Sequence, residues 1–343
     1  MARTTNAAAA GRAASKLPHS KAASAIPDLT SRIHLFALAA WALACDGVAA
    51  SAVVPSPDAG AGNPLYGSIV VSLRESTESK AAYGLVSGTL YDGPRPNPEP
   101  MRVVLEAGGC QLREAVHPFC TEPCGSAAVC VSDDQCMPYP HAQDVGAITV
   151  RGLDLDTGYT TLEPFAPTFF YQSEELAYPP CQPGVELRLE SSSFSANATC
   201  IAPLLVDADP VRVRSGEPVS LTWDTDGSVT ARIQILLDIS HHGGKRGDIL
   251  CDVPDTGSYT IPENMVTALV DLGLAGFPSV ILSRRFTGTW GEHSRTPTTT
   301  LSEVAFLVAA SVERPVDTGV HSCLNDQDCP TGQTCDRQTV SCH

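Results

Sequence analysis

The chain has 343 residues, of which 43% are hydrophobic and 17% charged, a balance that excludes an intrinsically disordered protein. Its 38 acidic against 22 basic residues give a net charge of −16, which disfavours nucleic acid and anionic membrane surfaces as partners. Gly and Pro number 27 each, which is typical of short strands and turns rather than long helices.

Residues 1–45 predict a secretory signal peptide. Basic residues are scattered through residues 1–33, and the apolar run 35–45 follows directly. These eleven residues would form a helix about 16 Å long, too short for roughly 30 Å of hydrocarbon. A basic lead, a short apolar core and small residues after it are typical of export signals. A buried helix and a transit peptide are the alternatives.

Two cleavage sites compete behind this apolar run. Residues 48–50 have the small-x-small form that a general signal peptidase accepts, which would release the chain at Ser51. Residues 41–45, WALAC, resemble a bacterial lipobox, although Ala42 stands where Leu is usual. The resemblance implies that Cys45 is lipidated and begins the mature protein, and we favour this anchor as the only membrane contact. Without residues 1–45 the chain keeps 17 basic and 37 acidic residues, a net charge of −20.

Twelve cysteines follow Cys45, an even number that suits complete disulfide pairing in an exported protein. They are Cys110, Cys120, Cys124, Cys130, Cys136, Cys181, Cys200, Cys251, Cys323, Cys329, Cys335 and Cys342. Cys181 and Cys200 flank a hairpin-like segment and are an expected pair. If the remaining cysteines before the tail all pair, Cys251 must bond to one of residues 110–136. The four tail cysteines allow three pairings, among which the sequence does not choose.

Residues 46–66 are predicted to be a linker, and residues 67–204 a first β-sandwich domain. Ile69, Val71 and Leu73 alternate with polar residues, as in a strand with one buried face. Further strand-like runs follow at 83–91, 101–106, 147–153, 168–172, 184–190 and 194–201. Short strands between Pro/Gly loops favour a sandwich or a barrel. Residues 110–140 interrupt this domain as a cysteine-rich insertion.

Residues 205–315 are predicted to form a second sandwich. The clearest alternation is 231–239, other strand-like runs lie at 219–223, 248–252, 258–261, 279–286 and 303–312, and a short helix starts at Pro262. Residues 216–223 and the D-x-G-x-Y element 255–259 resemble an immunoglobulin-like or fibronectin-III-like domain. The resemblance implies a corner at which the Tyr259 hydroxyl bonds to the backbone. Ile261 stands where antibody-type domains place a cysteine. The predicted fold class is therefore all-β, with two Ig-like β-sandwich domains.

Residues 316–343 form a cysteine-rich tail with the spacing C-x5-C-x5-C-x6-C. Residues 124–136 of the insertion repeat half of this spacing, and both segments resemble small disulfide modules of exported bacterial and animal proteins. Segments of this size bury too little apolar surface to fold without cross-links. The whole chain resembles bacterial envelope lipoproteins with Ig-like domains, a group that implies no particular activity.

No catalytic, cofactor-binding or metal-binding residue is predicted. Motifs for a serine nucleophile elbow, a zinc protease, a phosphate loop and a dinucleotide fold are missing. Only Cys120 and Cys124 have zinc-like spacing, and export favours their oxidation. The weighed alternatives are a metal site at His241 or His242 with Asp238 or Asp248, and calcium turns at Asp154 and Asp156 or at Asp224 and Asp226. Ordinary solvent loops and Asp/Gly turns are the preferred interpretation.

We therefore expect a non-enzymatic envelope protein that binds a protein or a glycan or builds surface structure. A carbohydrate-binding adhesin is the main alternative, and it requires an exposed aromatic platform. The clustered candidates for it are Tyr139, Phe169, Phe170, Tyr171 and Trp290, most of which we expect in the core. A secreted hydrolase is a further alternative, which requires a pocket with a nucleophile beside a base.

Overall fold

The computed structural model describes residues 64–77, 79–227, 230–240, 244–274, 278–291, 303–319, 323, 325–329, 331–336 and 341–342. The predicted signal peptide, Cys45 and most of the predicted linker lie outside these ranges. Within them the elements are strands apart from one α-helix and one short 3-10 turn, Asp326–Asp328. The predicted all-β fold class is confirmed.

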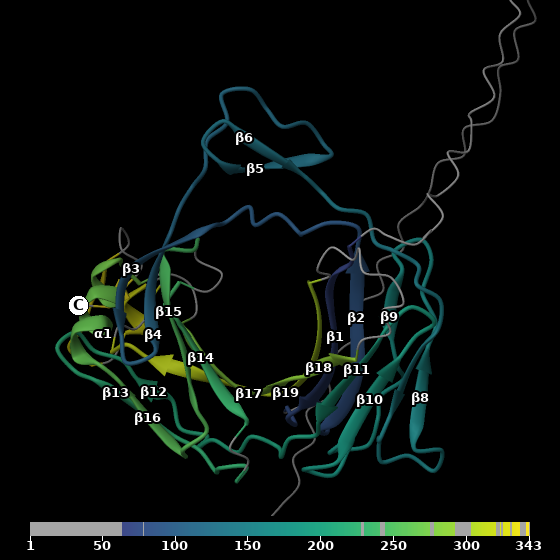
Figure 1. Ribbon diagram of the computed structural model, residues 1–343. Coiled ribbons are helices and arrows are strands. Elements are labelled where there is room, and N and C mark those ends of the chain that lie inside the picture. Colours follow the sequence, from purple (N-terminus) through teal and green to yellow (C-terminus); the bar gives the residue numbers. More distant parts are fainter. Residues whose placement is uncertain are drawn as a thin grey trace, which may run out of the picture. The chain divides into compact units, whose positions relative to one another are not determined.

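One long sheet runs through the molecule (Figure 1). Its strands, in spatial order, are β3 (Met101–Ala107), β4 (Cys110–Ala115), β15 (Gly247–Pro254), β14 (Arg232–Asp238), β17 (Ser279–Thr287), β19 (Glu303–Asp317), β1 (Tyr66–Arg74), β2 (Tyr83–Tyr91) and β9 (Phe170–Gln172). The two-residue strand β12 (Val211–Arg212) also pairs with β19.

Strands from both predicted domains share this sheet, with those of the second domain between two groups of the first. β19 has 15 residues and pairs with β17 on one side and, in parallel, with β1 on the other. β3 and β4, from the first predicted domain, lie at the opposite end from β1 and β2 and pair through β4 with β15 of the second. The predicted boundary between residues 204 and 205 therefore does not separate two sheets. Alternation identifies strands, but it carries no information about which distant strand becomes the neighbour.

Smaller sheets and a helix cover parts of the long sheet. One sheet has the order β18 (Thr289–Gly291), β11 (Ser195–Thr199), β10 (Glu186–Glu190), β7 (Ile148–Arg151) and β8 (Tyr159–Leu162). A second pairs β13 (Val219–Thr222) with β16 (Ser258–Ile261). Helix α1 (Glu263–Asp271) begins after Pro262 as predicted and buries Met265, Val266 and Leu269. These layers enclose the side chains of the long sheet that face them, of which Ile69, Val71 and Leu73 are at most 1% exposed.

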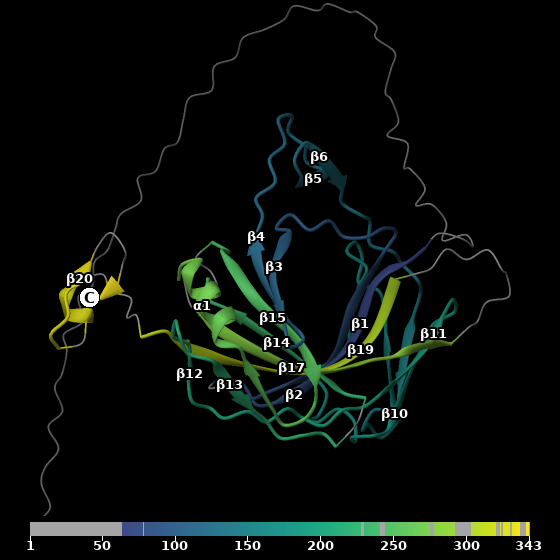
Figure 2. The ribbon, with the colours of Figure 1, turned by 60° about the vertical axis from the view of Figure 1, so that its left-hand side comes forward.

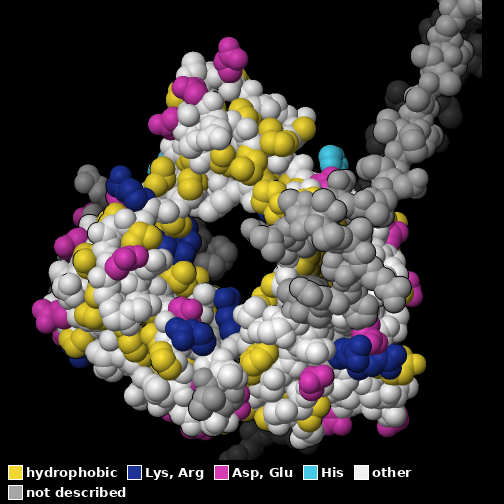
Figure 3. All heavy atoms as spheres, in the orientation of Figure 1, with side chains coloured by type: hydrophobic (Ala, Val, Ile, Leu, Met, Phe, Trp, Pro, Cys, Tyr) yellow, Lys and Arg dark blue, Asp and Glu magenta, His cyan; other side chains and the backbone are white. Residues whose placement is uncertain are grey.

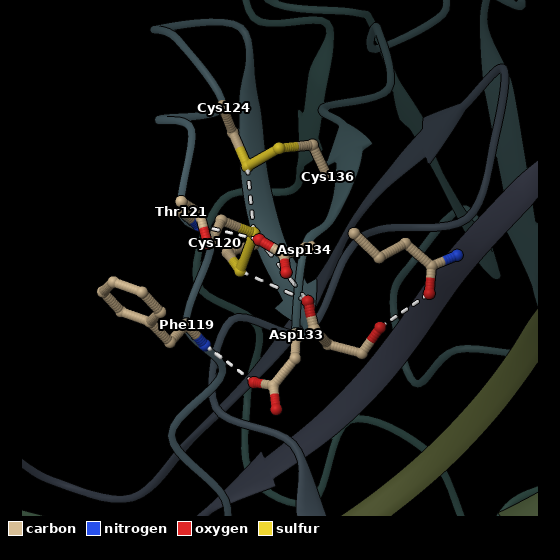
Figure 4. Close-up of a disulfide and its surroundings, with 10 residues drawn as sticks. Phe119, Cys120, Thr121, Cys124, Asp133, Asp134 and Cys136 are labelled. Atoms are coloured by element: carbon tan, nitrogen blue, oxygen red, sulfur yellow. Dashed lines mark hydrogen bonds between the residues drawn. A yellow bond between two sulfur atoms is a disulfide. The ribbon is translucent and has the colours of Figure 1, made fainter.

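The predicted insertion starts later than expected. Cys110 lies in β4 and pairs with β15, so residues 110–115 belong to the long sheet. The small module behind them is the hairpin β5 (Ala128–Ser132) and β6 (Gln135–Pro138), with the disulfides Cys120–Cys130 and Cys124–Cys136. Its turn is held by two aspartates (Figure 4): Asp133 accepts from the Phe119 amide at 3.0 Å and Asp134 from the Thr121 amide at 2.8 Å. The Thr121 hydrogen bonds lower the pKa of Asp134.

All twelve cysteines after Cys45 are paired, so the expectation of disulfide bonds is confirmed. Besides the two bonds of the insertion, the pairs are Cys110–Cys251, Cys181–Cys200, Cys323–Cys335 and Cys329–Cys342. The tail pairs are thus first-to-third and second-to-fourth, next to the short hairpin β20 (Cys335–Asp336) and β21 (Ser341–Cys342). Six disulfides are typical of an oxidising, extracellular or exported environment.

The Tyr259 hydroxyl bonds to the backbone, but to a distant part of it. It donates to the carbonyl oxygen of Gly108 at 2.7 Å, across a sequence separation of 151 residues. Gly108 has φ +60° and lies in the turn between β3 and β4, next to Cys110. The tyrosine therefore fastens the β3–β4 turn to the sheet beneath it rather than closing a local corner.

Candidate functional site

The long sheet has one face that the smaller sheets do not cover, which we call the open face. In β1, β2 and β19 it is formed by the alternate positions Ser68, Val70, Ser72, Leu85, Ser87, Thr89, Ala305, Leu307 and Ala309. All of these but Ser72 are half-buried, whereas the intervening residues of the same strands form the core. In Figures 1 and 2 the sheet curves, with the five-stranded sheet on its convex side and the open face on its concave side.

Two arginines lie opposite each other near the middle of the open face. Arg232 of β14 and Arg285 of β17 are direct cross-strand partners. Arg232 donates through Nε to Asp252 Oδ1 at 2.6 Å and through a terminal nitrogen to the Asp252 carbonyl at 2.8 Å. Burial lowers the pKa of Arg285, while the negative charge of Asp252 raises it. Figure 3 shows several Lys and Arg side chains at the margin of the hollow region.

A cavity of about 500 Å³ adjoins this charged group. Its walls include the side chains of Glu106, Gln111, Leu250 and Asp252 and the backbone of the Gly108–Gly109 turn. Gly108 and Gly109 both have positive φ, which L side chains rarely adopt, so the turn exposes bare backbone to the cavity. Asp252 contributes to both the cavity and the arginine pair, so the two features form one continuous site.

The structure brings together Asp238 and Asp248, which the sequence singled out beside the two histidines. They are cross-strand partners in β14 and β15 and are 9% and 0% exposed. Asp248 is 2.7 Å from Arg113 Nε and 2.9 Å from Lys245 Nζ, although its Oδ2 receives no well-directed hydrogen bond. Arg113 and Lys245 thus neutralise Asp248. This arrangement favours an ion-pair cluster that stabilises the end of the β14–β15 hairpin over a metal site. His241 and His242 lie outside the described residues.

The residues of the other metal alternatives lie in disulfides and in glycine-containing turns. Among the described residues, the trios of metal-ligating side chains within 4.8 Å of one another are Cys120–Cys124–Cys130 and Cys323–Cys329–Cys342. These sulfurs are bonded to each other or to further cysteines. The two predicted Asp/Gly turns end in Gly158 and Gly227, with φ of +70° and +74°. Both are thus turns that need glycine.

Exposed aromatic residues exist, but they are mostly not the predicted ones. Tyr171 is fully buried, Phe170 is 37% exposed and Tyr139 is 49% exposed. The side chain of Trp290 is not described. Phe165, which the sequence gave no reason to select, is 72% exposed and forms a β-bridge with Phe170. Because Phe170 pairs with Thr89, this phenylalanine pair borders the open face at its β9 edge.

Tyr171 supports a pH prediction. Its hydroxyl accepts from the Val145 amide at 2.9 Å, and burial raises its pKa. The folded pKa of Tyr171 exceeds the unfolded one. The stability contributed by its buried, neutral hydroxyl is therefore complete below pH about 10 and is lost as pH rises through the folded pKa. We expect Tyr171→Phe to weaken the alkaline loss of stability in urea titrations between about pH 8 and 11. Tyr159→Phe, at a side chain 40% exposed, is the control, and an equal effect there would contradict the prediction.

Neither a protein-family model nor a curated protein matches this sequence. Among the described residues, the structure contains no helix that is long and apolar enough to cross a membrane.

Proposed function

We propose that this protein is an exported, non-enzymatic binding protein of the cell envelope, and that the open face is its ligand surface. The observation that carries the proposal is the uncovered concave face with a cavity of about 500 Å³ at one end. A sheet face that mixes Ser and Thr with Val, Leu and Ala side chains can contact both the polar and the apolar parts of a ligand. The preferred ligand is a glycan, since carboxylates and an amide line the cavity and aromatic side chains border the face.

Export and anchoring at Cys45 belong to the same proposal. The resemblance to a lipobox supports the anchor, and the six disulfides support an oxidising environment. An acylated Cys45 would tether the first described strand through residues 46–65. Release by cleavage before Ser51 is the alternative.

A glycan array tests the ligand surface. We expect the purified oxidised protein to bind at least one extracellular glycan, and Ala309→Trp to abolish this binding by filling the open face beside Arg285. Ser87→Trp, on β2 of the same face, is a second blocking variant. Thr161→Trp, an exposed position on the five-stranded sheet, is the control. Unfolding midpoints identify variants that are merely destabilised.

Binding unaffected by both blocking variants would contradict the role of the open face. Binding lost equally in Thr161→Trp would also contradict it. Absence of binding to every glycan on the array would contradict the glycan preference.

A further inference from the structure

We propose that Arg285, together with Arg232, binds the carboxylate of an acidic sugar whose hydroxyl-bearing part occupies the neighbouring cavity. This inference deepens the proposed function and rests on it. It names the chemical class of the ligand and the side chain that selects it.

The first support is the placement of two like charges. Arg232 and Arg285 are directly opposite on neighbouring antiparallel strands, and their inward neighbours Ile233 and Arg284 are buried. Like charges in such a pair repel each other and destabilise the sheet. Asp252 neutralises one of them, so the local group keeps one net positive charge in a strongly acidic protein. A bound anion between the two guanidinium groups would remove the repulsion.

The second support is the state of Arg285. Within the described part of the chain its guanidinium forms no hydrogen bond and no ion pair. Arg285 is exposed on the open face, so its guanidinium is accessible to a ligand. A guanidinium presents a rigid fork of donors that matches a carboxylate with two parallel hydrogen bonds.

The third support is the chemistry of the adjoining cavity. Glu106 and Asp252 present acceptors, and Gln111 presents both donors and acceptors. Sugar hydroxyl groups donate to such acceptors, whereas further carboxylates of an acidic peptide would be repelled by them. A ligand with one carboxylate and several hydroxyls per unit therefore fits the site better than a uniformly anionic chain. Uronic acids have this composition.

Calorimetric titration of the full oxidised protein with an aldobiouronate, a single uronic acid joined to one neutral sugar, tests the inference. We expect wild-type binding, loss of binding when the carboxylate is methyl-esterified, and at least about tenfold weaker binding by Arg285→Gln. Arg285→Lys keeps the charge without the fork, so we expect an intermediate loss. The control is Arg212→Gln, which removes an equal charge at an exposed pair with Glu217 and should change affinity less than about twofold.

The inference is overturned if Arg285→Gln binds as tightly as wild type, or if the methyl ester binds as well as the acid. Oligoglutamate that binds equally, with the same dependence on Arg285, would assign the site to acidic peptides and overturn the sugar class. If the aldobiouronate fails to bind while Ala309→Trp still abolishes binding to another glycan, the inference fails and the proposed function stands. If the glycan array is also blank, both fail.

Discussion

Replacing Arg284 by Met is expected to lower the free energy of unfolding by about 3–5 kcal/mol, because it breaks a buried ion pair. Arg284 is 0% exposed and donates through Nε to Asp255 Oδ2 at 2.7 Å. It also donates to the carbonyl oxygens of Pro203, at 2.7 Å, and Asp224. Met fills a similar volume, but it leaves a buried carboxylate and several carbonyls without their cation.

The partner of Arg284 has a second role in the same cluster. Asp255 Oδ1 accepts from Trp223 Nε1 at 2.7 Å, so the carboxylate joins the residue after β13 to the end of β15. Asp255→Asn keeps the shape and should therefore cost less than Arg284→Met but still more than about 1 kcal/mol. Urea unfolding followed by tryptophan fluorescence measures both.

The matched control is Arg212→Met. Its pair with Glu217 has side chains 65% and 47% exposed, and such pairs contribute about 0–1 kcal/mol. A loss below about 1 kcal/mol for Arg284→Met would contradict the structural role of the buried pair.

Removing the Cys110–Cys251 disulfide with the double substitution Cys110→Ala and Cys251→Ala is expected to cost about 2–5 kcal/mol. The bond joins β4 to β15 across 141 residues of chain and is buried, with both cysteines at most 1% exposed. Its loss frees a long loop in the unfolded chain and leaves a gap in the core. The cavity beside Cys110 should also lose its shape, so ligand binding should weaken in parallel.

The control for this effect is the tail. Cys329→Ala with Cys342→Ala removes a bond that spans only 13 residues and touches no strand of the long sheet. We expect the main unfolding transition to be unchanged. If the tail variant were destabilised as strongly as the core variant, the disulfide between β4 and β15 would not be the main covalent support of the sheet.

The sequence predicted individual strands better than their assembly. β14 and the first part of β19 were predictable because their alternation is nearly uninterrupted. β4 was not, since its residues were assigned to the cysteine-rich insertion. The pairing of β4 with β15 depends on contacts between residues more than a hundred positions apart, and no local pattern encodes them. The cysteine count predicted that Cys251 reaches back to residues 110–136, but it could not identify Cys110 among them.

The candidate site illustrates the same limit. Arg232 and Arg285 are ordinary strand residues in sequence, and only the register of β14 with β17 places them opposite each other. The exposure of Phe165 was not predictable from the sequence, because the exposed fraction of a single aromatic side chain depends on which distant residues pack over its loop. Asp238 and Asp248 were predicted to lie in or beside a polar loop, yet the ion pair that neutralises Asp248 comes from Arg113 on a distant strand.

The intact mass of the protein from its native membrane fraction tests most directly whether the chain is exported, oxidised and anchored through Cys45. We predict a chain that begins at Cys45 with added acyl groups and that gains about 12 Da on reduction, two hydrogens for each of six disulfides. A chain beginning at Ser51 without acyl groups would contradict the anchor. A chain that retains residues 1–44 and free thiols would contradict export itself.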